Sequence, residues 1–286
     1  IFFSKHKMKI VFSLGILAVA AEAIKNGQHV HNPQADFPYM VSLQVSGIHQ
    51  CGGTVFDTTY PFTPGQFWQS YGDFAVLTAA HCIAPYLGQI PMTMIFENGQ
   101  SVELSGRDQT KLVTVHQQYD KPTANNDIAI IRLPASFKIV KGGARGVTPG
   151  YLNDNPAYDV PGNPETAVAI GYGSPGLYPD PSYPKLYRLD LLVAASLVCT
   201  NEAPLTGLVY DEPDRHICLQ GNTEYGVGKG DSGSPLINAA RERIIGVASY
   251  AFPQPQDREE ISGISAYMRV SAYAPWIRTQ LARRLR

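Results

Sequence analysis

The sequence has little of several features that mark whole classes of protein. Its 286 residues include only 4 cysteines, none in a C-x-x-C pair, and no N-x-S/T site for an N-linked glycan. With 23 basic and 24 acidic residues, the net charge of −1 shows no electrostatic footprint for nucleic acid or an anionic membrane. Beyond residue 20, no apolar run is long enough to cross a bilayer. What remains is a 44% hydrophobic chain, suited to one or two globular domains.

The first residues are typical of an export signal. Three lysines precede an apolar run at 10–20, which is too short to span a membrane and ends in small residues. Ala21-Glu22-Ala23 then fits the A-x-A pattern that signal peptidase cuts. We therefore expect residues 1–23 to be upstream residues plus a secretory signal peptide, and the protein to be secreted and extracellular. A buried helix is the alternative for the run, and cleavage after Ala20 is the alternative processing site.

Short apolar runs recur between clusters of glycine, proline and asparagine, a spacing typical of antiparallel barrels. A glycine-rich segment near residue 145 divides the chain into 24–145 and 146–286. One helix is expected at about 271–285, with Pro275 near its start. We predict strands at Tyr39–Val45, Phe74–Ala80, Met92–Phe96, Lys111–His116, Ile128–Leu133, Thr166–Ile170, Leu186–Val193, Arg243–Ser249 and Ile264–Val270.

Three motifs carry the chemistry. In chain order they are Thr78-Ala79-Ala80-His81-Cys82, Asn126-Asp127-Ile128-Ala129-Ile130 and Gly230-Asp231-Ser232-Gly233-Ser234-Pro235. A serine hydroxyl is a poor nucleophile until a histidine takes its proton, and that histidine needs a buried carboxylate to fix its tautomer. The motifs supply Ser232, His81 and Asp127 for these roles. Alone, the serine motif is typical of a Ser/Gly turn and the aspartate of a turn residue.

In the order His, Asp, Ser, these motifs resemble the chymotrypsin/trypsin family of secreted serine endopeptidases, over roughly Ile24 to the C-terminus. The resemblance implies an all-β fold of two antiparallel six-stranded β-barrels with a C-terminal helix. It also implies hydrolysis of peptide bonds through an acyl-enzyme by a monomer without cofactor or metal. Protein or peptide substrates and protein protease inhibitors are the partners it implies, and nucleic acid and membranes are not.

The resemblance assigns further roles around the nucleophile. The N–H groups of Gly230 and Ser232 would form an oxyanion hole. Ser249 would be a substrate-binding residue on the strand that pairs with the substrate backbone, and its side chain would support the buried aspartate. The ammonium of a new N-terminus at Ile24 would pair with Asp231, although Lys25 stands where a valine is usual.

Four cysteines allow three pairings, of which the resemblance favours Cys51–Cys82 and Cys199–Cys218. Catalytic thiols or a zinc site are the alternative. The segment between Cys51 and His81 is longer than the family leads one to expect, and the excess at 57–73 is a predicted surface loop. The remaining histidines are interpreted as surface or structural residues; they lie at positions 6, 29, 31, 49, 116 and 216.

Substrate preference depends on the predicted specificity pocket. Its floor maps to Gly226, where enzymes that hold Arg or Lys place an aspartate, and its walls map to Ala251 and Ser265. A chymotrypsin-like preference for large apolar residues is favoured, with an elastase-like preference as the alternative. A protease-fold binding protein without catalysis is a further alternative, while an esterase on another fold has the wrong order of catalytic residues.

Overall fold

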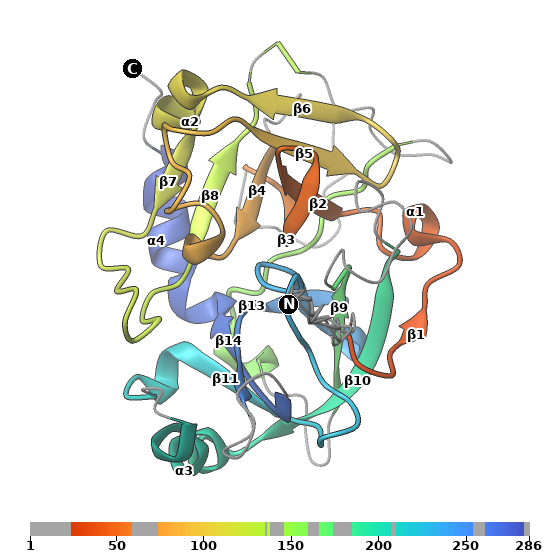
Figure 1. The fold of residues 1–286 in the computed structure, drawn as a ribbon, viewed down its shortest axis with the longest axis vertical. Coiled ribbons are helices and arrows are strands. Elements are labelled where there is room, and N and C mark those ends of the chain that lie inside the picture. The colour runs from red at the N-terminus through yellow and green to blue at the C-terminus, as the bar shows by residue number, and fades with distance from the viewer. Residues whose placement is uncertain are drawn as a thin grey trace, which may run out of the picture.

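Two antiparallel sheets make up the fold, one above the other in Figure 1. The computed structural model describes residues 24–58, 74–134, 136–137, 146–159, 166–173, 185–206, 210–253 and 261–282. The predicted signal peptide, most of the predicted loop at 57–73 and the predicted division near 145 lie outside these ranges.

The first sheet has the strand order β6-β5-β2-β3-β4-β8-β7. Every residue of β2 and β4 is buried, and β5 alternates between buried and half-buried positions, as expected for strands that face a packed interior. The strands are β2 (Met40–Val45), β3 (Ile48–Asp57), β4 (Phe74–Thr78), β5 (Met92–Phe96), β6 (Ser101–Leu104), β7 (Val113–Val115) and β8 (Ala129–Arg132).

The second sheet has the order β1-β10-β11-β14-β13-β12-β9, and an additional pairing of β9 with β10 closes six of its strands into a barrel. The seventh, β1, lies at the edge and comes from the start of the described chain. The strands are β1 (Gln28–His29), β9 (Thr166–Gly171), β10 (Tyr187–Ala194), β11 (His216–Gln220), β12 (Pro235–Asn238), β13 (Arg243–Pro253) and β14 (Ile261–Arg269). The all-β, barrel-like class is as predicted.

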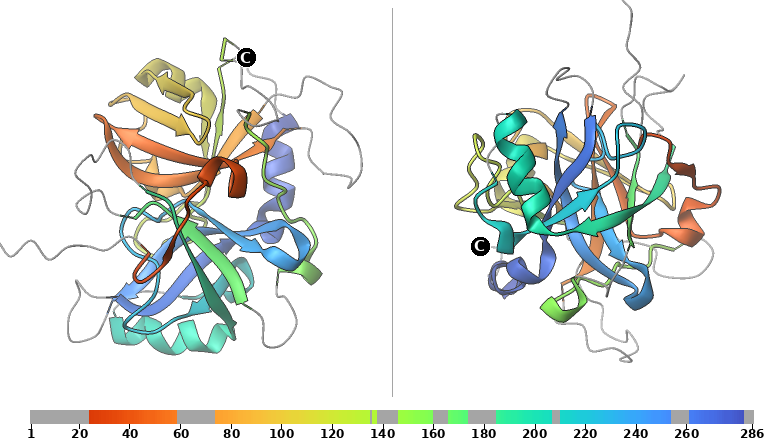
Figure 2. Two further views of the ribbon diagram at one scale, coloured as in Figure 1. Left: turned by 90° about the vertical axis from the view of Figure 1, so that its right-hand side faces the viewer. Right: turned by 90° about the horizontal axis from the view of Figure 1, so that it is seen from below.

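The C-terminal helix α4 spans Val270–Ala282, close to its predicted start. Arg132 of β8 donates to the carbonyls of Gln280 and Leu281, at 2.8 and 2.7 Å, so the end of the chain is tied to the first sheet. Figure 2 shows α4 beside that sheet, although it follows directly from the second. In the part of the chain that the structure describes, no helix has the length and apolar character to cross a membrane.

Three other helices were not predicted: α1 (Pro33–Asp36), α2 (Gly106–Leu112) and α3 (Ser196–Thr206). The predicted strand at Lys111–His116 is wrong in its first two residues, which belong to α2. Helix α2 begins with a capping box, in which the Ser105 side chain and the Asp108 side chain each accept from the other's backbone N–H. That local signal fixes a helix where the apolar pattern alone indicated a strand.

Candidate active site

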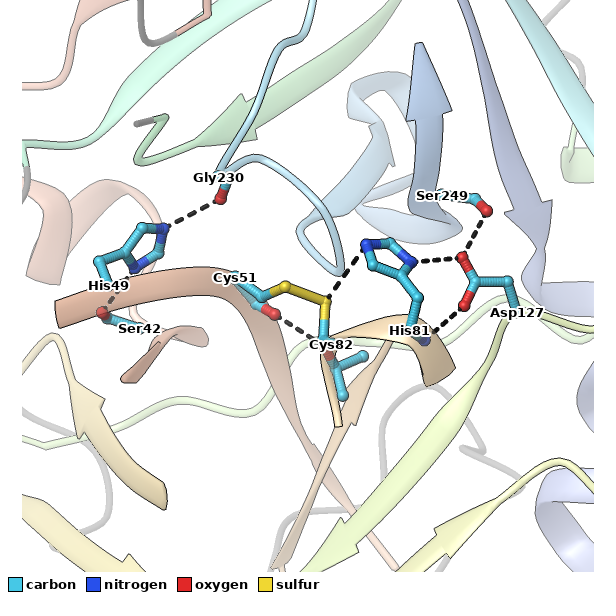
Figure 3. Close-up of a disulfide and its surroundings, with 10 residues drawn as sticks. Ser42, His49, Cys51, His81, Cys82, Asp127, Gly230 and Ser249 are labelled. Atoms are coloured by element: carbon cyan, nitrogen blue, oxygen red, sulfur yellow. Dashed lines mark hydrogen bonds and ion pairs between the residues drawn. A yellow bond between two sulfur atoms is a disulfide. The ribbon is translucent and has the colours of Figure 1, made fainter. Parts of the chain in front are cut away.

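His81 and Asp127 form the centre of the candidate site (Figure 3). The Nδ1 atom of His81 lies 2.7 Å from Oδ2 of Asp127, and the backbone N–H of His81 donates to Oδ1 at 2.8 Å. The Ser249 hydroxyl donates to Oδ2 at 2.6 Å. Asp127 is fully buried, so these three donors replace the water that a buried carboxylate loses.

The pairing of β4 with β8 explains how these residues meet. Thr78 at the end of β4 is opposite Ala129 at the start of β8. The chain leaves β4 into a single 3-10 turn, Ala80–Cys82, which carries His81, and Asp127 lies two residues before Ala129. An antiparallel register therefore places the two side chains on one edge of the first sheet, while Ser249 reaches them from β13 of the second.

The electrostatics of His81 suit a general base. Burial disfavours the imidazolium, but the hydrogen bond to Asp127 and the charge of that carboxylate together raise the pKa of His81 above its ordinary 6.5. Because Nδ1 donates to Asp127, the neutral ring has its lone pair on Nε2. The side chain of His81 is 35% exposed, so part of the ring is accessible to solvent.

Ser232 lies in a loop that packs against the same edge of the first sheet. Its carbonyl accepts from the N–H of Gly52 at 2.8 Å. The next residue, Gly233, has φ +79° and approaches the backbone of Gly52 and the hydroxyl of Thr78 so closely that a Cβ atom would lie 2.4 and 2.2 Å from them. Only glycine fits such an approach. The loop that carries Ser232 therefore packs directly against the strand end that leads to His81.

The structure does not join the hydroxyl of Ser232 to His81. Over the described residues, the Ser232 side chain makes no hydrogen bond, and Nε2 of His81 lies 3.8 Å from Sγ of Cys82. Catalytic hydrogen bonds in unliganded enzymes are often long or absent and tighten with substrate.

The candidate oxyanion donors point to no acceptor within the described chain. Neither the N–H of Gly230 nor that of Ser232 donates to any described residue. The N–H groups of Asp231 and Gly233, on either side of Ser232, donate to the carbonyls of Gly228 and Ala248. Gly230 has φ +88°, a left-handed conformation that favours glycine. This backbone leaves two unpaired donors in one short loop, which is what an oxyanion hole requires.

His49 holds this loop, a contact that the sequence analysis missed. Its Nε2 lies 2.9 Å from the carbonyl of Gly230, and its Nδ1 lies 2.8 Å from the Ser42 hydroxyl (Figure 3). Burial lowers the pKa of His49 to about 4, despite the opposing bond to Gly230. The neutral ring therefore donates through Nε2 and accepts through Nδ1. His49 is structural, as interpreted, but no pattern in its sequence context indicates this partner.

Asp231 is buried, and no cationic group bonds to it among the described residues. Its oxygens accept from the N–H groups of Gly173 and Gly228, each at 2.9 Å. Burial raises the pKa of this carboxyl to about 7 against these two bonds.

Ile24 is 2% exposed, and the following residue, Lys25, donates its N–H to Gly226 at 2.8 Å. Among the described residues, no hydrogen bond joins Ile24 to Asp231. In the full sequence, residues 1–23 precede Ile24. The two residues are instead connected through the loop that contains Asp231: Gly226 in this loop accepts from the N–H of Lys25, and Gly228 donates to Asp231.

The three residues predicted for the specificity pocket lie near one end of the second sheet. Ala251 of β13 and Ser265 of β14 are direct partners across the strands. Ser265 is 1% exposed, and its hydroxyl has no partner in the described chain. Gly226 follows β11 in a loop that also contacts the N-terminal segment.

Disulfides join Cys51 to Cys82 and Cys199 to Cys218. The first brings its sulfurs within 4.8 Å of an imidazole nitrogen of His81, the only group of metal-ligand atoms found in the described residues. Because both sulfurs are bonded to each other, neither is a thiolate that could bind a metal.

A cavity of about 170 Å³ is lined by Ser42 and Tyr172, which contact His49, but by none of the residues His81, Asp127 and Ser232. Tyr172, which lines it, packs its ring on that of His49 at 5.2 Å and donates its hydroxyl to Glu97. Burial raises the pKa of Glu97 to about 6 against this bond. Since neither His81 nor Ser232 lines the cavity, it is not the place where the candidate chemistry would occur.

Known proteins resemble the chain in sequence and in fold. The family model described as Trypsin matches residues 69–277. Trypsin beta from Drosophila erecta is 27% identical over 222 residues, which cover 76% of this chain and 75% of the relative. A solved structure of HL collagenase matches with a TM-score of 0.65 and 20% identity, covering 91% of this chain and all of its own. At 20% identity, the structural match is evidence for the fold alone.

Proposed function

Because the chain belongs to the trypsin family of serine proteases, we propose that it hydrolyses peptide bonds with Ser232 as nucleophile, His81 as general base and Asp127 as the orienting carboxylate. The observation that carries this proposal is the double hydrogen bond from His81 to Asp127, which leaves the basic lone pair of the neutral ring on Nε2. The seating of the Ser232 loop beside the same strand end supports it.

The proposed reaction follows from these positions. Ser232 Oγ attacks the carbonyl carbon of the scissile bond while Nε2 of His81 takes its proton, and Asp127 stabilises the resulting imidazolium. The tetrahedral oxyanion accepts from the N–H groups of Gly230 and Ser232. His81 then gives its proton to the leaving amine, and water, activated by the same imidazole, hydrolyses the acyl-enzyme.

The oxyanion donors are expected to make a large contribution. Removing one such donor from another serine protease costs about 3 kcal/mol in the transition state. The contact from His49 to the Gly230 carbonyl supports this role, because it restrains the loop that carries both donors.

We propose a preference for large apolar residues before the scissile bond. Gly226 brings no acid to the pocket floor, so a basic side chain would have no counter-charge there. An elastase-like preference is the second candidate, because the methyl group of Ala251 narrows the pocket relative to a glycine. One methylene of difference in such a pocket is worth only about 1–3 kcal/mol, so a peptide panel must decide.

We further propose that the protein is exported and that removal of residues 1–23 supplies the functional N-terminus. The buried carboxyl of Asp231 would then gain an ammonium partner, which would stabilise its charged form. N-terminal sequencing of the exported protein should find Ile24. A fully active protein that begins at Ala21 would contradict this mechanism.

The experiment compares Ser232→Ala and His81→Ala with a matched control in the same loop. The control is Ser234→Ala, since the Ser234 hydroxyl has no partner in the described chain. Chromogenic peptides with Phe, Tyr or Leu, Ala, and Arg or Lys before the scissile bond are the substrates. We expect kcat to fall by several orders of magnitude in both triad variants, with the double variant scarcely worse, and to persist in the control. A Ser232→Ala variant that keeps a tenth of the activity would refute the assignment.

A further inference from the structure

The residue before the candidate catalytic carboxylate has an unusual backbone. Asn126 has φ +56°, in the left-handed region that is uncommon for residues other than glycine and in which asparagine and aspartate are the most frequent exceptions. Its carbonyl accepts from the N–H of Ile128 at 2.8 Å, which closes a tight turn around Asp127. The direction in which Asp127 leaves the backbone therefore depends on this conformation.

The side chain of Asn126 is fixed from three directions. Arg215 donates Nη1 to its Oδ1 at 2.6 Å, and the Tyr273 hydroxyl donates to the same oxygen at 3.3 Å. Its Nδ2 donates to the carbonyl of Gln118 at 3.1 Å. Asn126 is 5% exposed, so these partners replace solvent. The contact from Arg215 is the shortest of the three and the only one with a charged donor, the stronger kind of hydrogen bond.

Arg215 is itself held in place. It ends the 3-10 turn Pro213–Arg215, its Nε lies 3.6 Å from a carboxylate oxygen of Glu212, and its guanidinium lies 5.9 Å from the centre of the Tyr273 ring. In the same segment, Asp211 accepts from the side chain of Asn125 at 2.8 Å. Segment 211–215, which leads into β11 of the second sheet, thus contacts two consecutive residues of the turn that carries Asp127 on the first sheet.

We infer that Arg215 is a positioning residue for the reaction: through Asn126 it locks the left-handed turn that aims Asp127 at His81. This inference rests on the proposed function of Asp127. Arg215 touches neither substrate nor the reacting atoms. Its effect is to keep the carboxylate at hydrogen-bonding distance from both the Nδ1 atom and the backbone N–H of His81.

The pH dependence of the reaction reports on this arrangement, because the hydrogen bond and charge of Asp127 raise the pKa of His81. A less well-aimed carboxylate would raise it less. Four other titratable groups interact with the charge of Asp127, namely Tyr119, His216, Tyr250 and Tyr273. All four stay neutral near pH 7, because burial raises the pKa of the tyrosines and lowers that of the histidine. Burial also raises the pKa of Asp231 to about 7 and that of Glu97 to about 6. The shift of the acid limb between Arg215→Ala and the parent, rather than its midpoint alone, therefore reports on His81.

The test measures kcat, KM and the pH profile for Arg215→Ala, Arg215→Lys and the control Arg278→Ala. Arg278 is likewise a half-exposed arginine paired with a carboxylate, 2.6 Å from Asp154, but it lies on α4. We expect Arg215→Ala to lower kcat about ten-fold with little change in KM, since misplacement by ~1 Å costs up to about a hundred-fold. Its acid limb should move to lower pH. Lysine should restore part of the rate, and the control should match the parent.

A second variant keeps the inference testable if Arg215→Ala does not fold. Asn126→Gly retains access to the left-handed conformation but removes the side chain that Arg215 holds. We expect the same loss of kcat, and no further loss when the two substitutions are combined, because they break one contact. Additive losses would overturn the inference, as would a parental kcat and pH profile in either single variant, whatever happens to the melting temperature.

The proposed function can be refuted independently of the positioning role of Arg215. If Asp127→Asn leaves peptide hydrolysis unchanged, the triad assignment is wrong. If Asp127→Asn abolishes hydrolysis while Arg215→Ala behaves like Arg278→Ala, only the positioning role is wrong.

Discussion

Removing residues 1–23, so that the chain begins at Ile24, should change how stability depends on pH. In the longer chain, burial raises the pKa of Asp231 from 3.8 to about 7. The folded protein therefore binds a proton that the unfolded chain has released, and this group's contribution to stability falls as the pH rises from about 4 to about 7. At roughly 1.4 kcal/mol for each unit of pKa, the buried charge costs about 4 kcal/mol above pH 7. In the processed chain, the ammonium of Ile24 should remove most of that cost.

The assay is urea unfolding at pH 5 and pH 8 of both chains, each with and without Asp231→Asn. Between pH 5 and pH 8, Asp231 should lower the unfolding free energy of the longer chain by roughly 3 kcal/mol. The Asp231→Asn variant of the longer chain should not show this fall. In the processed chain, Asp231→Asn should instead be destabilising at pH 8, because the ammonium loses its partner. If the substitution has the same effect on both chains at both pH values, Ile24 and Asp231 do not form a pair.

Two further predictions concern Asp127 and its partners. Ser249→Ala removes the 2.6 Å hydrogen bond to the buried carboxylate. It should lower kcat by roughly ten- to a hundred-fold, because a bond to a charged group contributes about 1.5–3 kcal/mol; an unchanged kcat in a steady-state assay would show that the bond plays no part. The rate of the parent enzyme should rise with pH through a pKa above 6.5, because His81 must lose its proton to act as base and Asp127 raises its pKa. A midpoint below 6.5 in the profile of kcat/KM would contradict that environment.

Local sequence patterns predicted most of the strands, but not a strand whose pattern is determined by contacts with other parts of the fold. The apolar runs at Tyr39–Val45 and Met92–Phe96 correspond closely to β2 and β5. The long β3 was not predicted, because Cys51-Gly52-Gly53 interrupts its pattern, and these glycines are explained only by the close approach of the Ser232 loop and of β4. Tertiary contact, not propensity, decides this strand.

Helices α2 and α3 show two other limits. Helix α2 is specified by its capping box, a signal that an analysis of apolar periodicity passes over. Helix α3 has no amphipathic period and contains Pro204, so its sequence gives little reason for a helix. It buries Cys199 and Ala203 against the second sheet, and the bond from Cys199 to Cys218 of β11 fixes it there.

The candidate site shows the same difference between residues that a local motif predicts and residues that only a tertiary contact identifies. His81, Asp127 and Ser232 were predicted because each lies in a short motif whose chemistry depends on residue type. Residues that act through shape or a backbone contact carry no such motif: His49 bonds to a carbonyl 181 residues away, and Arg215 to a side chain 89 residues away. Only the folded arrangement of the two sheets brings these partners together.

The central claim is that Ser232 is a nucleophile activated by His81, and covalent labelling tests it most directly. The processed protein would be treated with a serine-directed sulfonyl fluoride near pH 8, and the intact mass and the modified peptide would be measured. One adduct on Ser232 is expected in the parent and in Ser234→Ala, with none in Ser232→Ala and a rate of labelling lower by orders of magnitude in His81→Ala. A folded parent that stays unlabelled, or an adduct that persists in Ser232→Ala, would contradict the claim.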